Sequence, residues 1–153
     1  MTEIRRASSA DAGAMAELRW EFRAGRQPPT EPHAAFIKRC GTWMRSELTT
    51  AKAWRAWVAI TDGVMVGQVW LHTIPKIPNP FTESERHAYL SNLYVRPADR
   101  GGIGTRLLEA AIAAARADGV DRVVLWPSGR SVTLYLRHGF THGGDVMELK
   151  VRS

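Results

Sequence analysis

The chain has 153 residues, with 21 Lys and Arg against 15 Asp and Glu, so its formal net charge is +6. This length suits one domain, expected over residues 1–153, and an ordinary hydrophobic share supports a packed core. No apolar run reaches the roughly 18 residues of a membrane span and no signal peptide opens the chain, so we expect a cytoplasmic protein. The single cysteine, Cys40, excludes an internal disulfide, and no Cys/His spacing predicts a zinc or other metal site.

The first half of the chain changes from a helical to a strand-like pattern. Ser8, Ser9 and Asp11 can cap a helix, and Asp62-Gly63 is typical of a hairpin turn. Prolines between Gly25 and Pro32 separate two helical patterns. The predicted elements are a strand over Thr2–Ala7, helices over Asp11–Arg23 and His33–Leu48, and strands over Trp54–Ile60 and Val64–Thr73.

The second half alternates strands and helices. Its predicted elements are a strand over Ala88–Val95, a helix from Gly101 to about Asp118, a strand over Val120–Trp126, a helix over Ser131–His138, and a last hairpin of Phe140–Thr141 and Asp145–Val151. The complete order is β-α-α-β-β-β-α-β-α-β-β. This order predicts an α/β fold of the α+β kind, in which helices cover a mixed sheet.

A glycine-rich segment, Arg100–Thr105, opens the helix that follows the strand Ala88–Val95. The first N–H groups of a helix have no intrahelical partner, and the helix dipole adds partial positive charge there. Glycines let an anion approach these groups, so the segment is typical of a diphosphate site. The alternative is a turn that only lets helix and strand pack closely. The spacing fits neither a nucleoside-triphosphate loop nor a dinucleotide fold.

Two motifs together resemble the GCN5-related N-acetyltransferase (GNAT) family. Leu93-Tyr94-Val95-Arg96-Pro97 followed by Arg100–Leu108 is similar to the family's acetyl-CoA motif, and Leu134-Tyr135 with His138-Gly139-Phe140 to its later signature. Trp54–Gly67 is similar to the family's preceding hairpin. The resemblance covers nearly the whole chain. It implies a single GNAT-like domain with a mostly antiparallel sheet, and an acyltransferase that uses acetyl-CoA and no metal.

The chain departs from the family pattern at two points. Asp99 stands where the family often has Gln or Arg, with the basic residue one place later at Arg100, so the turn is one residue shorter. Ser128 stands where many members have Asn.

The resemblance also implies roles for individual residues. Backbone groups near the middle of the expected strand would pair with the pantetheine arm, and Tyr135 would protonate the leaving thiolate as general acid. The expected cofactor-binding residues are Leu93, Tyr94, Val95, Arg100, Gly101, Gly102, Ile103, Gly104, Thr105, Ser128 and Tyr135. For Tyr135 the alternative is a structural tyrosine with a satisfied hydroxyl.

The acceptor side is less determined by the sequence. Glu17, Glu21 and His72 are candidates to accept the amine's proton, and Asn92 is a candidate only to position a water molecule. A water chain to solvent is the alternative to a dedicated base. The expected partner is a small-molecule or peptide amine. One or two of the six tryptophans, with Trp20 and Trp70 as first candidates, would line an aromatic pocket for an apolar or cationic amine.

Two other classes of protein remain open at this point. An acetyl-CoA sensor without catalysis would share the cofactor motif. A polyanion-binding or nucleic-acid-binding module would share the positive charge, although the arginines form no dense run and no nucleic-acid motif is present, so nucleic acid is not the expected partner. The family resemblance is also compatible with a homodimer.

Overall fold

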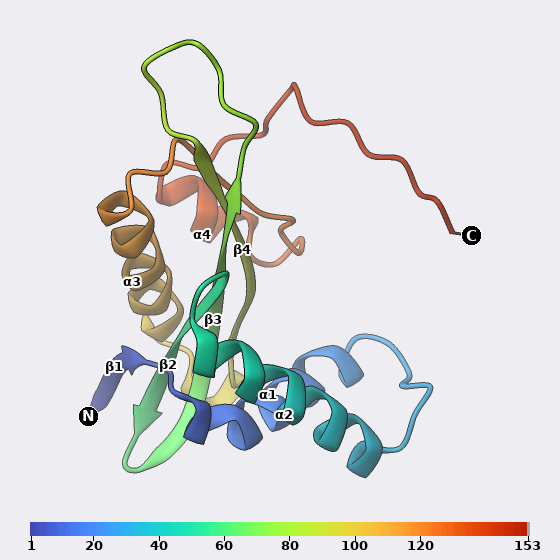
Figure 1. Cartoon of the computed structure of the whole chain (residues 1–153). Helices are drawn as coiled ribbons and strands as arrows, with labels where there is room; N and C mark the ends of the chain where they lie inside the picture. Colours follow the sequence, from blue (N-terminus) through green and yellow to red (C-terminus); the bar gives the residue numbers. More distant parts are fainter. Residues whose placement is uncertain (153) are drawn as a thin grey trace.

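The computed structural model describes residues 1–152. Its strands are β1 Thr2–Arg6, β2 Trp54–Thr61, β3 Val64–Pro75, β4 Arg86–Val95 and β5 Val123–Val124, and its α-helices are α1 Ala12–Ala24, α2 His33–Thr50, α3 Ile103–Ala117 and α4 Val132–Arg137. The strands form one sheet in the order β1-β2-β3-β4-β5, antiparallel except for the parallel pair β4 and β5 (Figure 1). The predicted α+β class and the mostly antiparallel sheet are confirmed.

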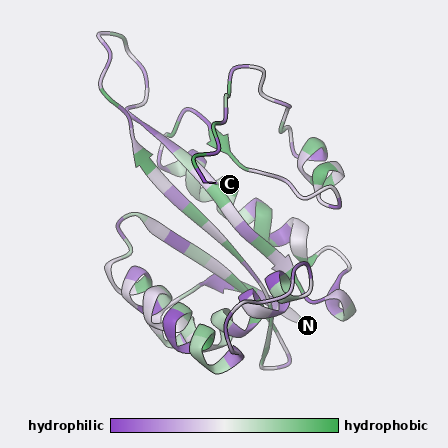
Figure 2. Ribbon diagram, turned by 90° about the vertical axis from the view of Figure 1, so that its right-hand side faces the viewer, coloured by the Kyte–Doolittle hydropathy of each residue, from purple (hydrophilic) through white to green (hydrophobic). Residues whose placement is uncertain are grey.

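The sheet lies between two helical layers, α1 with α2 on one face and α3 on the other (Figure 2). Side chains that alternate along β2 explain both layers, because successive side chains of a strand point to opposite faces. Ala56 and Val58 join the core cluster of α1 and α2, whereas Trp57 and Ala59 join the cluster of α3. The sheet is therefore buried on both faces.

The last predicted hairpin is wrong. The structure has neither helix nor strand over residues 140–152, and this segment runs away from the sheet to the C-terminus (Figure 1). The segment predicted as the second strand of this hairpin contains Val146, Met147, Leu149 and Val151, and each of these side chains is more than half exposed. An isolated hairpin is only marginally stable in water. In this structure the segment does not pack against an apolar face of the sheet that could stabilise a hairpin.

The strand predicted over Val120–Trp126 is confirmed only at Val123–Val124. The ladder with β4 ends at Tyr89↔Val124, so the residues after Val124 have no strand to pair with. Trp126 consequently leaves the sheet and is 66% exposed. The other predicted helices and strands are present, with ends that shift by a few residues.

Within residues 1–152, no helix is both long enough and apolar enough to cross a membrane. The same residues hold no group of three His, Cys, Asp or Glu side chains arranged to bind a metal ion.

Candidate functional site

Strand β4 is irregular at its centre. Its register with β3 shifts between Gln68↔Tyr94 and Trp70↔Ser91, so two residues of β4, Asn92 and Leu93, face one residue of β3. Asn92 has a φ of 57°, a left-handed conformation that asparagine tolerates better than most residues. Such a bulge bends a strand and redirects its groups.

The bulge also separates β4 from β5. The two strands pair only at Ala88↔Val123 and Tyr89↔Val124, so no strand of the described chain pairs with this edge of β4 from residue 90 onward. The backbone N–H and C=O groups of that edge can bind an extended ligand as an added strand would.

The start of α3 lies beside this open edge. Gly101 and Gly102 have φ values of 153° and 98°, and a φ of 98° is strained for any side chain larger than glycine. The first backbone bond into the helix runs from the Arg106 N–H to the Gly102 carbonyl, at 3.1 Å. The N–H groups of the first turn therefore have no intrahelical partner. Together with the positive end of the helix dipole, they form a place where an anion can bind.

A cavity of 300 Å³ lies between β4 and the N-terminus of α3, and we name it the β4–α3 cavity. Nine of the eleven residues expected from the sequence line it: Leu93, Tyr94, Val95, Arg100, Gly101, Gly102, Gly104, Thr105 and Ser128. The Ile103 side chain packs against the core beside α3 instead. Tyr135 lines a neighbouring cavity, so the structure gathers nine of the eleven and leaves two outside.

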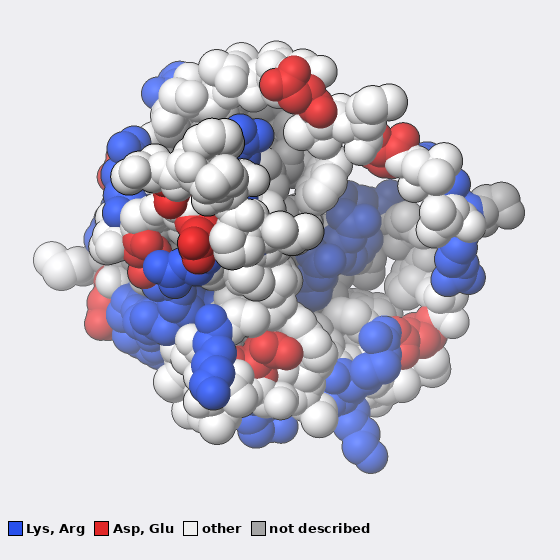
Figure 3. Space-filling view, turned by 45° about the horizontal axis from the view of Figure 1, so that its top comes forward, with Lys and Arg blue, Asp and Glu red and all other residues white. Residues whose placement is uncertain are grey.

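Four arginines that line the β4–α3 cavity give it a positive potential: Arg26, Arg100, Arg130 and Arg137. In residues 1–152 none of the four pairs with a carboxylate, and no Asp or Glu lines the cavity. Figure 3 shows blue Lys and Arg side chains within a hollow between the body of the protein and the C-terminal segment. Sequence reasoning missed three of these four arginines, because they come from three segments that are distant from the glycine-rich motif.

Tyr135 is buried on α4, and its ring packs at 5.5 Å edge-on to Phe140. Burial raises the pKa of Tyr135, and the nearby Ser131 hydroxyl offsets part of this effect. The same helix turn contributes Ser131 and Leu134 to the β4–α3 cavity. Tyr135 therefore lies beside that cavity as a protonated phenol at neutral pH.

A second cavity, of 480 Å³, lies on the other side of the bulge, and we name it the aromatic cavity. Three indoles form one wall: Trp70 lies 5.7 Å from Trp43 and 6.0 Å from Trp54 between ring centroids. Tyr89 lies 6.0 Å from Trp54. Arg19 and Asn92 also line it, and no carboxylate does. Consecutive residues of β4, Asn92 and Leu93, thus line the two cavities, which meet at the bulge.

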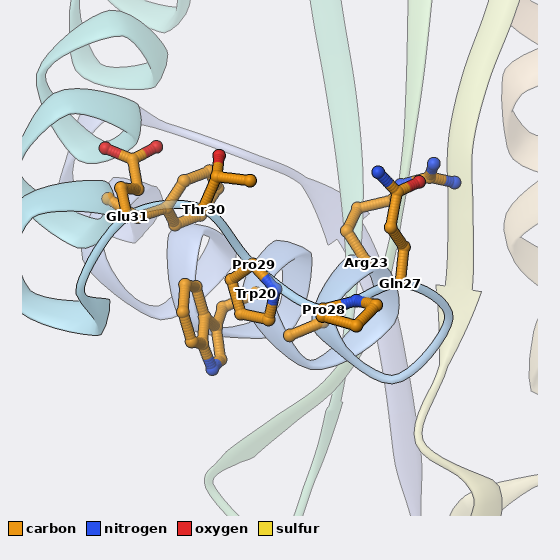
Figure 4. Close-up of a pocket in the computed structure, with 9 residues that line it drawn as sticks. Trp20, Arg23, Gln27, Pro28, Pro29, Thr30 and Glu31 are labelled. Atoms are coloured by element: carbon orange, nitrogen blue, oxygen red, sulfur yellow. The ribbon is translucent and has the colours of Figure 1, made fainter.

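The structure places the two tryptophans expected at the acceptor pocket in different cavities. Trp70 lines the aromatic cavity, but Trp20 lines a separate cavity of 220 Å³. Figure 4 shows Trp20 beneath the loop that joins α1 to α2, beside Pro29. That loop folds over the indole and keeps it out of the aromatic cavity.

Of the four candidates for handling the amine's proton, only Asn92 lines the aromatic cavity. Glu21 pairs with Arg96 at 2.8 Å, and Glu17 bonds to His33 at 2.8 Å. His72 stacks on Trp54 with a centroid distance of 4.5 Å. The two carboxylates and the histidine are thus engaged in other contacts.

Comparison with known proteins agrees with this geometry. A family model described as the acetyltransferase (GNAT) family matches residues 14–140. A crystal structure of a predicted acetyltransferase with acetyl-CoA from Clostridium acetobutylicum is 21% identical with a TM-score of 0.81, over 98% of this chain and 96% of that one.

Two further structures are similar. A GCN5-related N-acetyltransferase from Ralstonia eutropha JMP134 is 25% identical with a TM-score of 0.80, over 98% of this chain and 99% of that one. The aminoglycoside N-acetyltransferase AAC(6′)-Iy in complex with CoA is 18% identical with a TM-score of 0.71, over 100% of this chain and 96% of that one. No curated protein matches the sequence.

Proposed function

The chain belongs to the acetyltransferase (GNAT) family, whose model matches most of its length, and from that premise we propose that it transfers the acetyl group of acetyl-CoA directly to a primary amine. The observation that carries the proposal is the meeting of two cavities at the β4 bulge. The β4–α3 cavity suits the cofactor, and the aromatic cavity suits the acceptor. Both volumes fall in the range of roughly 300–1,000 Å³ that is usual for small-molecule sites.

Coenzyme A is an extended polyanion, and the β4–α3 cavity complements each of its parts. The free N–H groups at the start of α3 and the four unpaired arginines suit its phosphates. The open edge of β4 at Leu93 and Val95 suits the amides of the pantetheine arm. The thioester would then lie at the bulge, within reach of the acceptor.

The transfer needs an attack, a polarised carbonyl and a proton for the leaving group. The amine nitrogen attacks the thioester carbonyl and forms the C–N bond. The nitrogen then loses a proton to water, and the C–S bond breaks as the tetrahedral intermediate collapses. An N–H of the bulge near Leu93 would stabilise the oxyanion. Tyr135 would give its phenolic proton to the thiolate, and it would recover a proton from solvent.

The amine must lose a proton before it attacks, because an ammonium is no nucleophile. No carboxylate lines the aromatic cavity, so no residue there is a conventional base. We propose that water in the cavity accepts this proton and passes it to solvent.

Acetyl-CoA binding is the first test. A ligand at about 100 times its Kd stabilises a protein by roughly 2.7 kcal/mol, so acetyl-CoA should raise the Tm. Arg100→Ala removes an exposed, unpaired cation from the cavity. We expect about a tenfold weaker Kd for acetyl-CoA, about 1.4 kcal/mol, with the free energy of unfolding changed by less than about 0.5 kcal/mol. Calorimetric titration measures the first and urea unfolding the second.

Arg116→Ala is the matched control, because Arg116 lies at the opposite end of the same helix. It should leave the Kd for acetyl-CoA unchanged. If acetyl-CoA does not raise the Tm of the protein, the functions of acetyltransferase and of acetyl-CoA sensor are both excluded. A general polyanion-binding module is then favoured. If acetyl-CoA binds but no amine in a panel releases free thiol, the sensor replaces the enzyme.

Gly104→Ala separates cofactor binding from stability. A Cβ at this position would lie 3.8 Å from Val95 Cγ2 and 4.0 Å from Leu134 Cδ2, so the fold accommodates it. Alanine stabilises a helix by about 0.5–1 kcal/mol over glycine. The new methyl group occupies the β4–α3 cavity, so the KM for acetyl-CoA should rise about fivefold, a loss of about 1 kcal/mol, while the Tm does not fall.

The control for this substitution is Gly13→Ala on α1, where nothing lies within 4 Å of the new Cβ. It should bring a similar helix stabilisation without any change in the KM for acetyl-CoA. An unchanged KM in Gly104→Ala would show that the cofactor does not occupy the space beside Gly104.

A further inference from the structure

The aromatic cavity contains one cation that no anion of the protein balances. Arg19 is half-buried on α1 and donates a hydrogen bond from Nη1 to Asn92 Oδ1 at 3.2 Å. It forms no ion pair with any carboxylate of residues 1–152. Arg39, which also lines the cavity, pairs with Glu31 and is neutralised. Arg19 therefore supplies the unbalanced positive charge of the cavity.

This arrangement is unfavourable until an anion binds. Burial lowers the pKa of Arg19, with a further contribution from the nearby Arg23, which means that the charged guanidinium is poorly solvated. A planar guanidinium with free N–H groups binds a carboxylate in a bidentate manner. A carboxylate of the acceptor would therefore replace the solvation that Arg19 has lost.

The position of Arg19 limits how far this carboxylate can be from the reacting amine. Its guanidinium is bonded to Asn92, the residue of the bulge that precedes Leu93. The amine must reach the thioester at the same bulge, so carboxylate and amine have to be close neighbours in the acceptor. This requirement fits an α-amino acid and does not fit a long diamine.

The rest of the cavity is apolar and aromatic. Trp70 is nearly fully buried, and its Nε1 donates to Gln68 Oε1 at 3.0 Å, so it supports the wall from behind while the more exposed Trp43 offers apolar surface to a ligand. Trp43 and Trp54 complete this wall. A polycation such as an aminoglycoside would need carboxylates, and the cavity lining has none.

We infer that the acceptor is an α-amino acid with an apolar or aromatic side chain, bound through its carboxylate to Arg19 and through its side chain to the Trp43–Trp54–Trp70 wall. This inference rests on the proposed acetyl transfer. It makes the product an N-acetyl amino acid. Arg19 acts as a specificity-determining residue.

The test compares L-phenylalanine with L-phenylalaninamide and with phenethylamine, by thiol release at saturating acetyl-CoA. The amine of the amide is less basic than the amine of the acid, so a larger fraction of the amide is the neutral, nucleophilic form. A higher rate with the acid therefore cannot result from the ionisation of the amine. We expect kcat/KM for phenylalanine to exceed both alternatives by tenfold or more. Arg19→Ala should abolish this preference, and Arg19→Lys should restore part of it, with the KM for acetyl-CoA unchanged in both.

Arg45→Ala is the control, because Arg45 is an exposed arginine of α2 that lines neither cavity. It should keep the preference for phenylalanine. Equal rates with the acid and the amide, or an unchanged preference in Arg19→Ala, would overturn the inference while leaving the proposed transfer intact.

If no amine is acetylated, the proposed transfer fails, and binding still decides the inference. N-acetyl-L-phenylalanine should then bind the CoA-loaded protein at least tenfold more tightly than N-acetyl-L-phenylalaninamide, in an Arg19-dependent manner. Equal affinity for the N-acetyl acid and the N-acetyl amide would reject the inferred contact between Arg19 and a carboxylate.

Discussion

Replacing Tyr135 with phenylalanine should lower kcat by about a hundredfold while the Kd for acetyl-CoA stays within about twofold of the original. A positioned general acid contributes typically 10²–10⁴-fold to a rate. The substitution removes only the hydroxyl, so the packing of the ring against Phe140 is kept. Because burial raises the pKa of Tyr135, its phenol stays protonated through the alkaline range, and the loss in kcat should be the same from pH 7 to pH 9.

The measurement is single-turnover acetylation with the best amine of the panel, together with a titration of acetyl-CoA. Thr133→Ala is the matched control, because it removes an exposed hydroxyl of the same helix that lines neither the β4–α3 cavity nor the aromatic cavity. A kcat within threefold of the original in Tyr135→Phe would reject the role as general acid. Tyr135 would then be a structural side chain between α4 and Phe140.

The cofactor side could be predicted from the sequence because its residues are local. The strand, the glycine turn and the helix start lie within Leu93–Thr105, and the short connection from β4 to α3 brings their backbone groups together. The cations from Arg26, Arg130 and Arg137 could not be predicted in this way. They reach the same cavity from the turn after α1, from the loop before α4 and from α4 itself, so their position depends on the packing of distant elements.

The residues of the aromatic cavity also meet only through the packing of distant elements, so the sequence does not predict the cavity. Trp43, Trp54 and Trp70 come from α2, β2 and β3, and no periodicity relates them. Trp20 has the same residue type and lies on α1, yet the loop between α1 and α2 covers it. Hydrophobic pattern predicts which face of an element is buried, and it does not predict which aromatic residues meet across elements.

The error at the C-terminus has a different cause. Alternation over Asp145–Val151 predicts a strand correctly only when a neighbouring edge is there to pair with it. Strand β5 is two residues long and pairs with β4 at Ala88 and Tyr89. The short ladder that leaves the later edge of β4 open thus also leaves little edge of β5 for another strand.

Gln68 links helix α1 to Trp70 of the aromatic cavity through two buried hydrogen bonds. Gln68→Leu should lower the free energy of unfolding by about 3 kcal/mol. Gln68 is fully buried, donates from Nε2 to the Met15 carbonyl at 2.9 Å, and accepts from Trp70 Nε1. Leucine fills similar space and leaves the Trp70 Nε1–H buried without a partner, whereas the Met15 carbonyl keeps its bond within α1. A buried donor without a partner costs about 1–3 kcal/mol, and the lost bond to the carbonyl adds about 1 kcal/mol. For a domain of this length the Tm should fall by roughly 10 °C.

The same substitution should also change acceptor binding. Met15 lies one helical turn before Arg19 on α1, and Trp70 forms part of the aromatic wall, so Gln68 fixes both walls of the cavity at once. Below the new Tm, we expect the KM for the acceptor to rise several-fold and the KM for acetyl-CoA to stay unchanged. Trp70→Phe alone and combined with Gln68→Leu completes a double-mutant cycle in unfolding free energy, which isolates the bond between the two side chains. A coupling energy near zero, or a Gln68→Leu protein as stable as the original, would mean that this buried amide neither stabilises the sheet nor orients Trp70.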